Sequence, residues 1–245
     1  MVLNKKINPF FILSLLAIVL HLSFCKKEKN TTIAIDDGYN YFSFDVGKYV
    51  IYDVDSIVHN DFTQQVDTFK YQLKELNESI FLDNSGRNTM RKERYKRNYN
   101  DTVAYDLMPW ILISASQANK TNTTVEETEN NVRYVKLNFP VKKDKSWNGN
   151  VYNTLGEQNY SYTDIHVSRT IGTIAFDSTL LVTQINTENL IEKKYHIEIY
   201  ATNIGLVDKE ITDVKSTNIV AGVPLMKRIT SGVEYKMTIH SYGSN

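Results

Sequence analysis

Apolar and polar residues alternate along many short stretches of this chain, and a period of two is typical of β-strands with one buried face. The clearest alternation lies near the end of the chain: Val233, Tyr235, Met237 and Ile239 against Glu234, Lys236, Thr238 and His240. The same pattern predicts further strands over residues 48–58, 69–74, 132–141, 176–185 and 190–202. The chain is therefore expected to be rich in β-structure.

Polar segments separate these runs and predict where the chain turns. The four residues 83–86, Asp-Asn-Ser-Gly, follow an apolar run that ends at Leu82 and precede a polar, strand-like segment over 89–99, which together predict a hairpin. The pair Asn148-Gly149 predicts a tight turn. Residues 117–131 are rich in Asn, Thr and Glu and are expected to form a loop or insertion.

No internal repeat and no sustained amphipathic helix of ~11 residues or more interrupts the strand signals. Strands joined by short polar turns favour a mostly antiparallel meander, and such a sheet must curl, close or be capped to protect its edges. We therefore predict an all-β fold over 41–245, a single curved antiparallel meander that is half-barrel or barrel-like.

The first 24 residues have the layout of an export signal. Lys5 and Lys6 precede an apolar run over 10–20 that is shorter than the ~20 residues needed to cross a bilayer, and a polar stretch begins directly after Cys25. An ordinary secretory signal with a chance cysteine and an uncleaved anchor helix are the alternatives. Residues 25–40 are mostly polar and are expected to form a flexible tether.

This leader resembles a bacterial lipoprotein signal, with Leu22 three residues before Cys25 and the small Ser23 between them; Phe24 stands where such signals usually have Gly, Ala or Ser. The resemblance implies that Cys25 is the lipidation site and that the lipid holds the protein on a membrane. The charged residues 26–28 resemble sorting sequences of Bacteroidota surface lipoproteins, which implies an address in the cell envelope and favours the outer membrane.

Short motifs along the rest of the chain extend the resemblance: residues 47–49 (Gly-Lys-Tyr), 147–150 (Trp-Asn-Gly-Asn) and 204–207 (Ile-Gly-Leu-Val) ahead of Lys209-Glu210. Together with the signal they resemble small β-rich lipoproteins of Bacteroidota that have no assigned activity. The strand pattern is more distantly similar to the curved half-barrel of bacterial lipoprotein-carrier proteins. The resemblance implies no catalytic residues.

Composition excludes several classes of function. The 28 basic residues equal the 28 acidic ones, which argues against a nucleic-acid binder. One cysteine excludes an intrachain disulfide, a Cys-rich zinc site and an iron–sulfur cluster. Catalytic and phosphate-binding motifs are absent, so no cofactor and no enzymatic activity are expected. The remaining hypotheses are a non-catalytic binding or structural lipoprotein, a carrier of an apolar ligand, and a hydrolase with paired carboxylates.

One segment is unusually basic. Six cations fall within eleven residues: Arg87, Arg91, Lys92, Arg94, Lys96 and Arg97. In a strand, Lys92, Arg94 and Lys96 share one face. They are a candidate binding patch for an anionic envelope component, such as lipid headgroups, polysaccharide or an acidic protein. The alternatives are an edge strand protected by charge, or a strand paired with acidic neighbours.

Four histidines follow the leader, and they share no ligand spacing. His196 and Glu198 lie on one face of a predicted strand and could supply half of a metal site, or they could form a polar pair on a solvated face. No metal site is therefore assigned.

Overall fold

The computed structural model describes residues 36–245. The predicted leader over 1–24, Cys25 and most of the predicted tether lie outside the described residues. Within 36–245 the chain forms one antiparallel sheet of twelve strands, in the order β6-β5-β4-β3-β2-β1-β12-β11-β10-β9-β8-β7. The strands are β1 (Lys48–His59), β2 (Val66–Leu82), β3 (Asn88–Asn98), β4 (Ile111–Lys120), β5 (Thr124–Glu129), β6 (Val132–Asn138), β7 (Ser146–Asn148), β8 (Asn159–Ile171), β9 (Ile174–Glu188), β10 (Glu192–Ala201), β11 (Gly205–Lys215) and β12 (Ser231–Ser244).

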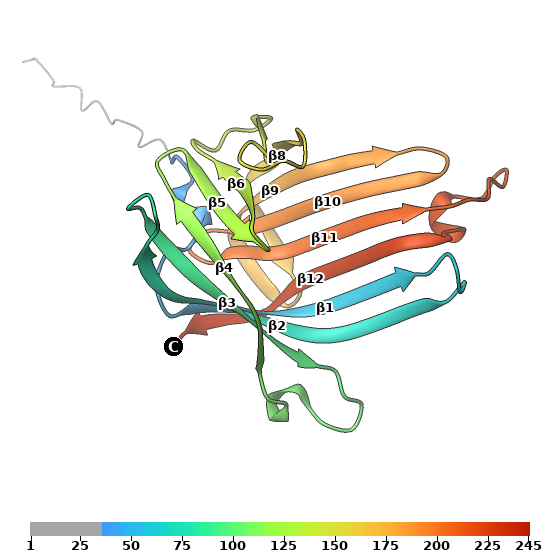
Figure 1. Ribbon diagram of the computed structural model, residues 1–245, viewed down its shortest axis with the longest axis horizontal. Helices are drawn as coiled ribbons and strands as arrows, with labels where there is room; N and C mark the ends of the chain where they lie inside the picture. Colours follow the sequence, from blue (N-terminus) through green and yellow to red (C-terminus); the bar gives the residue numbers. More distant parts are fainter. Residues whose placement is uncertain (1–35) are drawn as a thin grey trace, which may run out of the picture. The chain divides into compact units, whose positions relative to one another are not determined.

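The sheet is two meanders joined at its centre. Strands β1 to β6 follow one another on one side, β7 to β12 on the other, and β1 pairs with β12. Figure 1 shows β9–β12, β1 and β2 as a broad layer, with β3–β6 crossing over one end of it. The sheet is nearly closed and barrel-shaped. The all-β, curved antiparallel fold is therefore confirmed.

Closure relies on contacts between β6 and the β7–β8 hairpin. The indole Nε1 of Trp147 donates to the Val135 carbonyl at 2.9 Å, and the Val135 amide donates to the Gly149 carbonyl at 2.8 Å. The Tyr162 hydroxyl donates to the Asn138 carbonyl at 3.0 Å. These bonds satisfy backbone groups at the sheet edges, which would otherwise be open to pairing with other chains.

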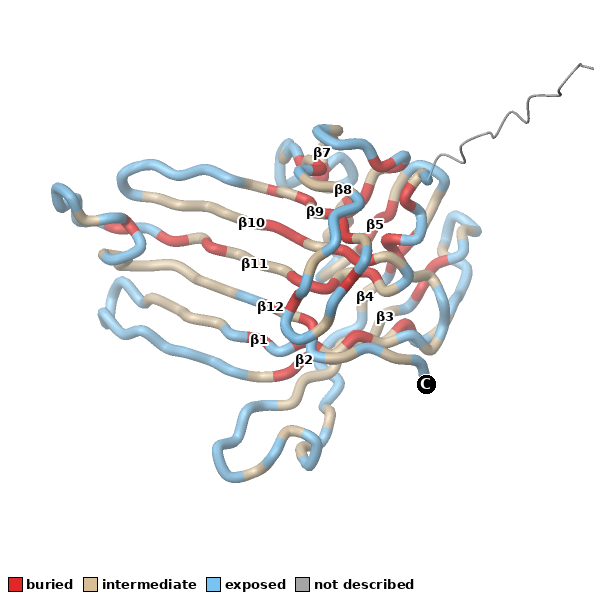
Figure 2. The backbone as a smooth tube through the Cα atoms, turned by 180° about the vertical axis from the view of Figure 1, so that it is seen from behind, coloured by how far each residue is buried: buried red, intermediate tan, exposed pale blue. Residues whose placement is uncertain are grey.

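Two apolar clusters form the core, both from residues within 36–245. One joins β3–β10 around Leu137, Tyr162 and Leu180, and the other joins β1, β2 and β8–β12 around Tyr52 and Met237. In Figure 2 the buried segments gather where β3–β6 cross the broad layer. Residues 36–245 also form one compact unit by their internal contacts. This part of the chain therefore carries the core it needs to fold by itself.

The loop predicted over 117–131 is wrong, because the structure places β4 and β5 there. Ala118 and Val125 are fully buried in the first cluster. The acidic residues that suggested a loop are also buried, since Arg87 contacts Glu126 and Lys92 contacts Glu127. Ion pairing across strands therefore outweighs the local polar signal.

Two boundaries also differ from the prediction. The turn predicted at Asn148-Gly149 is displaced: the chain turns over 149–152, where the Asn153 amide donates to the Asn150 carbonyl at 3.0 Å, within a longer loop that returns at Gln158. A Cβ on Gly149 would lie 2.4 Å from the Tyr160 ring, so close packing explains the glycine. The last residues of the expected tether are packed as well. The Asp37 carbonyl accepts from Val141, and the Tyr39 ring lies 4.7 Å from that of Phe139.

Within residues 36–245, no helix has the length and apolar character needed to cross a membrane. The helical segments there are single 3-10 turns, η2 (Tyr39–Tyr41), η3 (Tyr105–Leu107) and η4 (Leu225–Lys227).

Candidate functional site

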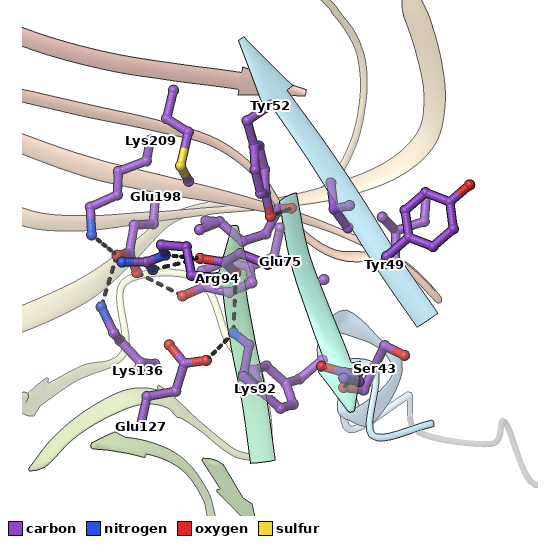
Figure 3. Close-up of a pocket in the computed structure, with 18 of the residues that line it drawn as sticks. Ser43, Tyr49, Tyr52, Glu75, Lys92, Arg94, Glu127, Lys136, Glu198 and Lys209 are labelled. Atoms are coloured by element: carbon purple, nitrogen blue, oxygen red, sulfur yellow. Dashed lines mark hydrogen bonds and ion pairs between the residues drawn. The ribbon is translucent and has the colours of Figure 1, made fainter. Parts of the chain in front are cut away.

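A cavity of about 250 Å³ lies inside the sheet, where β3, β5 and β6 cross over β1, β2 and β10–β12. Its wall is charged: four glutamates and five cations from seven strands face it, together with tyrosines. Figure 3 shows Lys92, Arg94, Lys136 and Lys209 directed toward glutamates of other strands. Eight of these residues form ion pairs with one another and are here called the charged cluster: Glu75, Lys92, Arg94, Glu127, Glu129, Lys136, Glu198 and Lys209; Lys48 also lines the cavity.

Strand register brings opposite charges together. Glu75 on β2 is directly opposite Arg94 on β3, and Glu198 on β10 is directly opposite Lys209 on β11. Opposite residues in an antiparallel pair project to the same face, with Cβ atoms about 5 Å apart. Both pairs therefore face the barrel interior, and a shift of one residue in either register would separate them.

One half of the charged cluster is centred on Glu75. Its carboxylate accepts from the Arg94 guanidinium at 2.5 and 3.0 Å, and Lys92 Nζ lies 3.3 Å from its other oxygen. Lys92 also donates to Glu127 at 2.5 Å, and Arg94 lies 4.0 Å from Glu129. Charges alternate in sign along this series, so each is next to its opposite.

The other half is centred on Glu198, whose side chain is only 1% exposed. Its carboxylate accepts from Lys136 at 2.9 Å and from the Tyr200 hydroxyl at 2.6 Å, and it lies 3.1 Å from Lys209 Nζ. Lys136 comes from β6, which is far from β10 in the order of the sheet. Closure of the barrel is therefore what completes this group.

The pairing keeps the buried groups charged. Burial by itself would raise the pKa of the Glu75 and Glu198 carboxyls, but the cations beside them hold both pKa values well below the usual range. Burial opposes the charge on Lys136 too, yet Glu198 and Glu129 raise its pKa. Burial raises the pKa of Tyr52, which stays a neutral hydroxyl. With four carboxylates and four cations, the cluster has no net charge at neutral pH.

The pKa values of the cavity glutamates bear on the hydrolase hypothesis. The hydrolase hypothesis needs two carboxyls across a cleft, one with a raised pKa to act as the acid. Glutamates do gather around one cavity, but the pKa values of Glu75 and Glu198 are lowered, and Lys136 lowers that of Glu129 as well. The glutamates with lowered pKa values are therefore ionised and in contact with cations.

The basic segment lies on β3, between β2 and β4, so it is not an edge strand. Lys92 and Arg94 belong to the charged cluster. On the other face, Arg91 contacts Glu93 at 2.9 Å, and Arg87 contacts Asp83 at the same distance. Arg87, Arg91, Lys92 and Arg94 are therefore paired with acidic neighbours, which was one of the two alternatives to a binding patch.

The last two residues of the segment contact aromatic rings. Lys96 Nζ lies 4.0 Å from the centre of the Tyr71 ring, and the Arg97 guanidinium lies 4.3 Å from that of Trp110. Because the six cations are divided between the two faces of the sheet, they do not share one surface. Binding of an anionic partner by this segment stays a prediction.

His196 and Glu198 share the inner face of β10, as the spacing predicts, but that face is not solvated there. Glu198 is occupied by two lysines and Tyr200. The Nε2 atom of His196 is buried and has no hydrogen-bond partner within the described chain, and burial lowers the pKa of the ring. Within residues 36–245 no group of three or more His, Cys, Asp or Glu is placed to hold a metal ion.

The alternation pattern did not predict that most residues of the charged cluster are buried. Glu127 and Glu129 lay in the segment predicted as a loop, and Glu75, Lys136 and Lys209 looked like ordinary solvated positions of alternating strands. A signal was available: in β2, Glu75 follows Tyr71 and Leu73 on the inward face at a spacing of two. A charge in register with apolar residues indicates a buried position that needs a partner.

Comparison with known proteins assigns no family. No protein-family profile and no curated protein matches the chain. Among solved structures, a chain described as an exported protein with a YmcC-like fold from Bacteroides fragilis is 10% identical, with a TM-score of 0.43, over 83% of this chain and 98% of that one. A chain described as a lipoprotein from Parabacteroides distasonis has the same identity and coverage and a TM-score of 0.31.

A third similar structure is a domain described as an outer membrane lipoprotein-sorting protein from Vibrio parahaemolyticus. It is 10% identical, with a TM-score of 0.22, over 86% of this chain and 91% of that one. Similarity at this level does not assign a function, which must be argued from the residues of this chain.

Proposed function

We propose that the protein is a cell-envelope lipoprotein, held on a membrane by a lipid on Cys25, that binds a small polar ligand in its barrel without transforming it. The leader and Cys25 support the address. Each buried CH₂ of an acyl chain contributes ~0.8 kcal/mol, so two or more chains would make release from the membrane slow. The charge-lined cavity is the observation that carries the binding role.

The cavity wall favours a polar ligand over an apolar one. A space of 250 Å³ corresponds to about eight water molecules at ~30 Å³ each. An apolar molecule there would strip water from eight charged side chains and return no hydrogen bonds. A neutral polyhydroxylated solute, which can both donate and accept, would satisfy carboxylates and cations together, and the rings of Tyr52 and Tyr200 could pack against its carbon skeleton.

The ligand test uses protein purified from its native envelope and analysed for retained small molecules by mass spectrometry after denaturation. Wild type is compared with Arg94→Gln, which changes the cavity wall, and with Lys70→Gln, a matched change of an exposed side chain that contacts Asp55 at 3.7 Å. We expect a polar solute enriched in wild type and in Lys70→Gln but depleted in Arg94→Gln. Retention of a lipid that Arg94→Gln does not alter would favour the apolar-carrier alternative.

The address is tested separately by metabolic labelling with a fatty-acid probe. Wild type should take up label and Cys25→Ser should not, because this is the only thiol in the chain. Equal labelling of both proteins, or of neither, contradicts the anchor. Protease treatment of intact cells then tells whether the protein faces outward.

A further inference from the structure

Three hairpin turns lie side by side at one end of the broad layer. They join β1 to β2 (residues 60–65), β9 to β10 (189–191) and β11 to β12 (216–230). The register aligns them, because His59 is opposite Gly232 and Lys215 is opposite both Ser231 and Glu192. Figures 1 and 2 show the three turns at the end of the sheet away from the crossing strands β3–β6.

These turns expose large apolar side chains where turns are usually polar. Phe62 is 95% exposed, Leu190 68% and Ile219 62%. Ile191 and Val220 beside them are also exposed. We call these five residues the apolar tip. Isolated exposed apolar residues are common, but a row of them across adjacent turns indicates an interaction surface.

Hydrogen bonds shape the first two turns so that the apolar residues point outward. In the β1–β2 turn, the Asn60 side-chain oxygen accepts from the amides of Phe62 and Thr63, both at 3.0 Å. In the β9–β10 turn, the Asn189 side-chain oxygen accepts from the amides of Ile191 and Glu192 at 2.8 and 2.9 Å. The same device thus satisfies backbone donors at two separate turns.

Arg228 ties the third turn to the second. Its guanidinium donates to the Val223 carbonyl at 3.1 Å, to the Leu190 carbonyl at 2.6 Å and to the Asn218 carbonyl. The Ser216 amide also donates to the Ile191 carbonyl at 2.8 Å. The Val223 and Asn218 carbonyls of the long β11–β12 turn are therefore satisfied by the protein itself. The bonds to Leu190 and Ile191 also hold this turn next to the β9–β10 turn.

Charges next to the tip are paired. Lys193 lies 3.1 Å from Glu188, and Glu192 lies 3.6 Å from Lys194 and 3.3 Å from Lys215. At these strand ends acids and bases are therefore in contact with one another, which weakens their attraction or repulsion toward a charged surface.

We propose that the apolar tip inserts into the interface of a lipid bilayer. Separate convex points suit entry between lipid headgroups, whereas a protein partner usually needs a broad complementary face. A bilayer supplies few hydrogen bonds to a turn, and here Asn60, Asn189 and Arg228 supply them from within. The described chain starts at the opposite end of the barrel, where the Asp37 carbonyl accepts from the Val141 amide (Figure 1).

Residues 36–245, which lack Cys25 and carry their own core, allow the test without any acyl group. The protein is floated with vesicles of phosphatidylcholine alone at low and at high salt. We expect binding that salt leaves unchanged, and a loss of about tenfold in partitioning for each apolar side chain replaced in Phe62→Ser, Leu190→Ser and Ile219→Ser.

A matched control replaces three apolar residues that are equally exposed elsewhere, Leu82, Leu107 and Leu155, by serine. This variant should float like wild type. The proposal is overturned if wild type does not float, if the control loses binding as the tip variants do, or if binding requires anionic lipid and disappears in salt. None of these outcomes bears on the ligand of the cavity, which is tested with cavity variants.

Discussion

The ion pair between Glu198 and Lys136 gives a quantitative test of the interior. Both side chains are almost fully buried, with 1% and 7% of their surface exposed, and their charged atoms lie 2.9 Å apart. Removing one partner of a buried pair typically costs about 3–5 kcal/mol, because the other charge stays buried without compensation. That is a large part of the roughly 5–15 kcal/mol that stabilises a typical domain.

The two single variants should differ. Glu198→Gln leaves Lys136 facing a neutral amide, so we expect a loss in the middle of that range, about 4 kcal/mol. Lys136→Met leaves the carboxylate with Lys209 at 3.1 Å and Tyr200 at 2.6 Å, so its loss should be smaller. The loss of unfolding free energy in the double variant should be smaller than the sum of the two single losses, by at least about 1 kcal/mol, because neither charge of the pair then stays buried without its partner.

Urea unfolding followed by tryptophan fluorescence measures these changes, because Trp147 is buried in the core. Lys70→Met serves as the control: its contact with Asp55 is 3.7 Å long and both side chains are 60% exposed, so a change of about 0–1 kcal/mol is expected. A loss below ~1 kcal/mol for Glu198→Gln, or additive single and double variants, would refute a desolvated ion pair at this position.

Three further predictions follow from the same interior. The folded-state pKa values of Glu75 and Glu198 are depressed, so the stability that these carboxylates contribute is present above their ordinary pKa of 4.5 and is lost as the pH falls below it. The decrease in stability with falling pH should therefore be shallower in Glu198→Gln than in wild type. Circular dichroism between pH 7 and 2 measures it. Burial raises the pKa of Asp208, so its ionised form is destabilising at neutral pH, and Asp208→Asn, which can still accept from Thr238, should raise Tm at pH 7 but not at pH 3. Gly149→Ala should lower stability by about 1–3 kcal/mol in urea unfolding, because its Cβ would lie 2.4 Å from the Tyr160 ring; an unchanged midpoint would show that the ring can move.

The structure also explains why one polar segment lies at the surface and another is buried. The turn 60–65 is polar in sequence and does lie at the surface, whereas Glu126 and Glu127 are equally polar in sequence and lie inside. The difference lies in the partners available: Arg87, directly before β3, contacts Glu126, and Lys92 on β3 contacts Glu127. Burial of a charge depends on its compensation, which a local hydrophobicity pattern does not record.

The sequence by itself determined the β class, most of the strands and the antiparallel meander, because a period of two and short polar turns are local properties that each strand carries separately. The alternation over 233–239 on β12 is the clearest example. Only the tertiary structure decided that the sheet nearly closes, that Lys136 meets Glu198 across the barrel, and that β4 and β5 exist as strands. These features depend on register and on contacts between residues far apart in the chain, and the charged cavity exists only where such contacts bring opposite charges together.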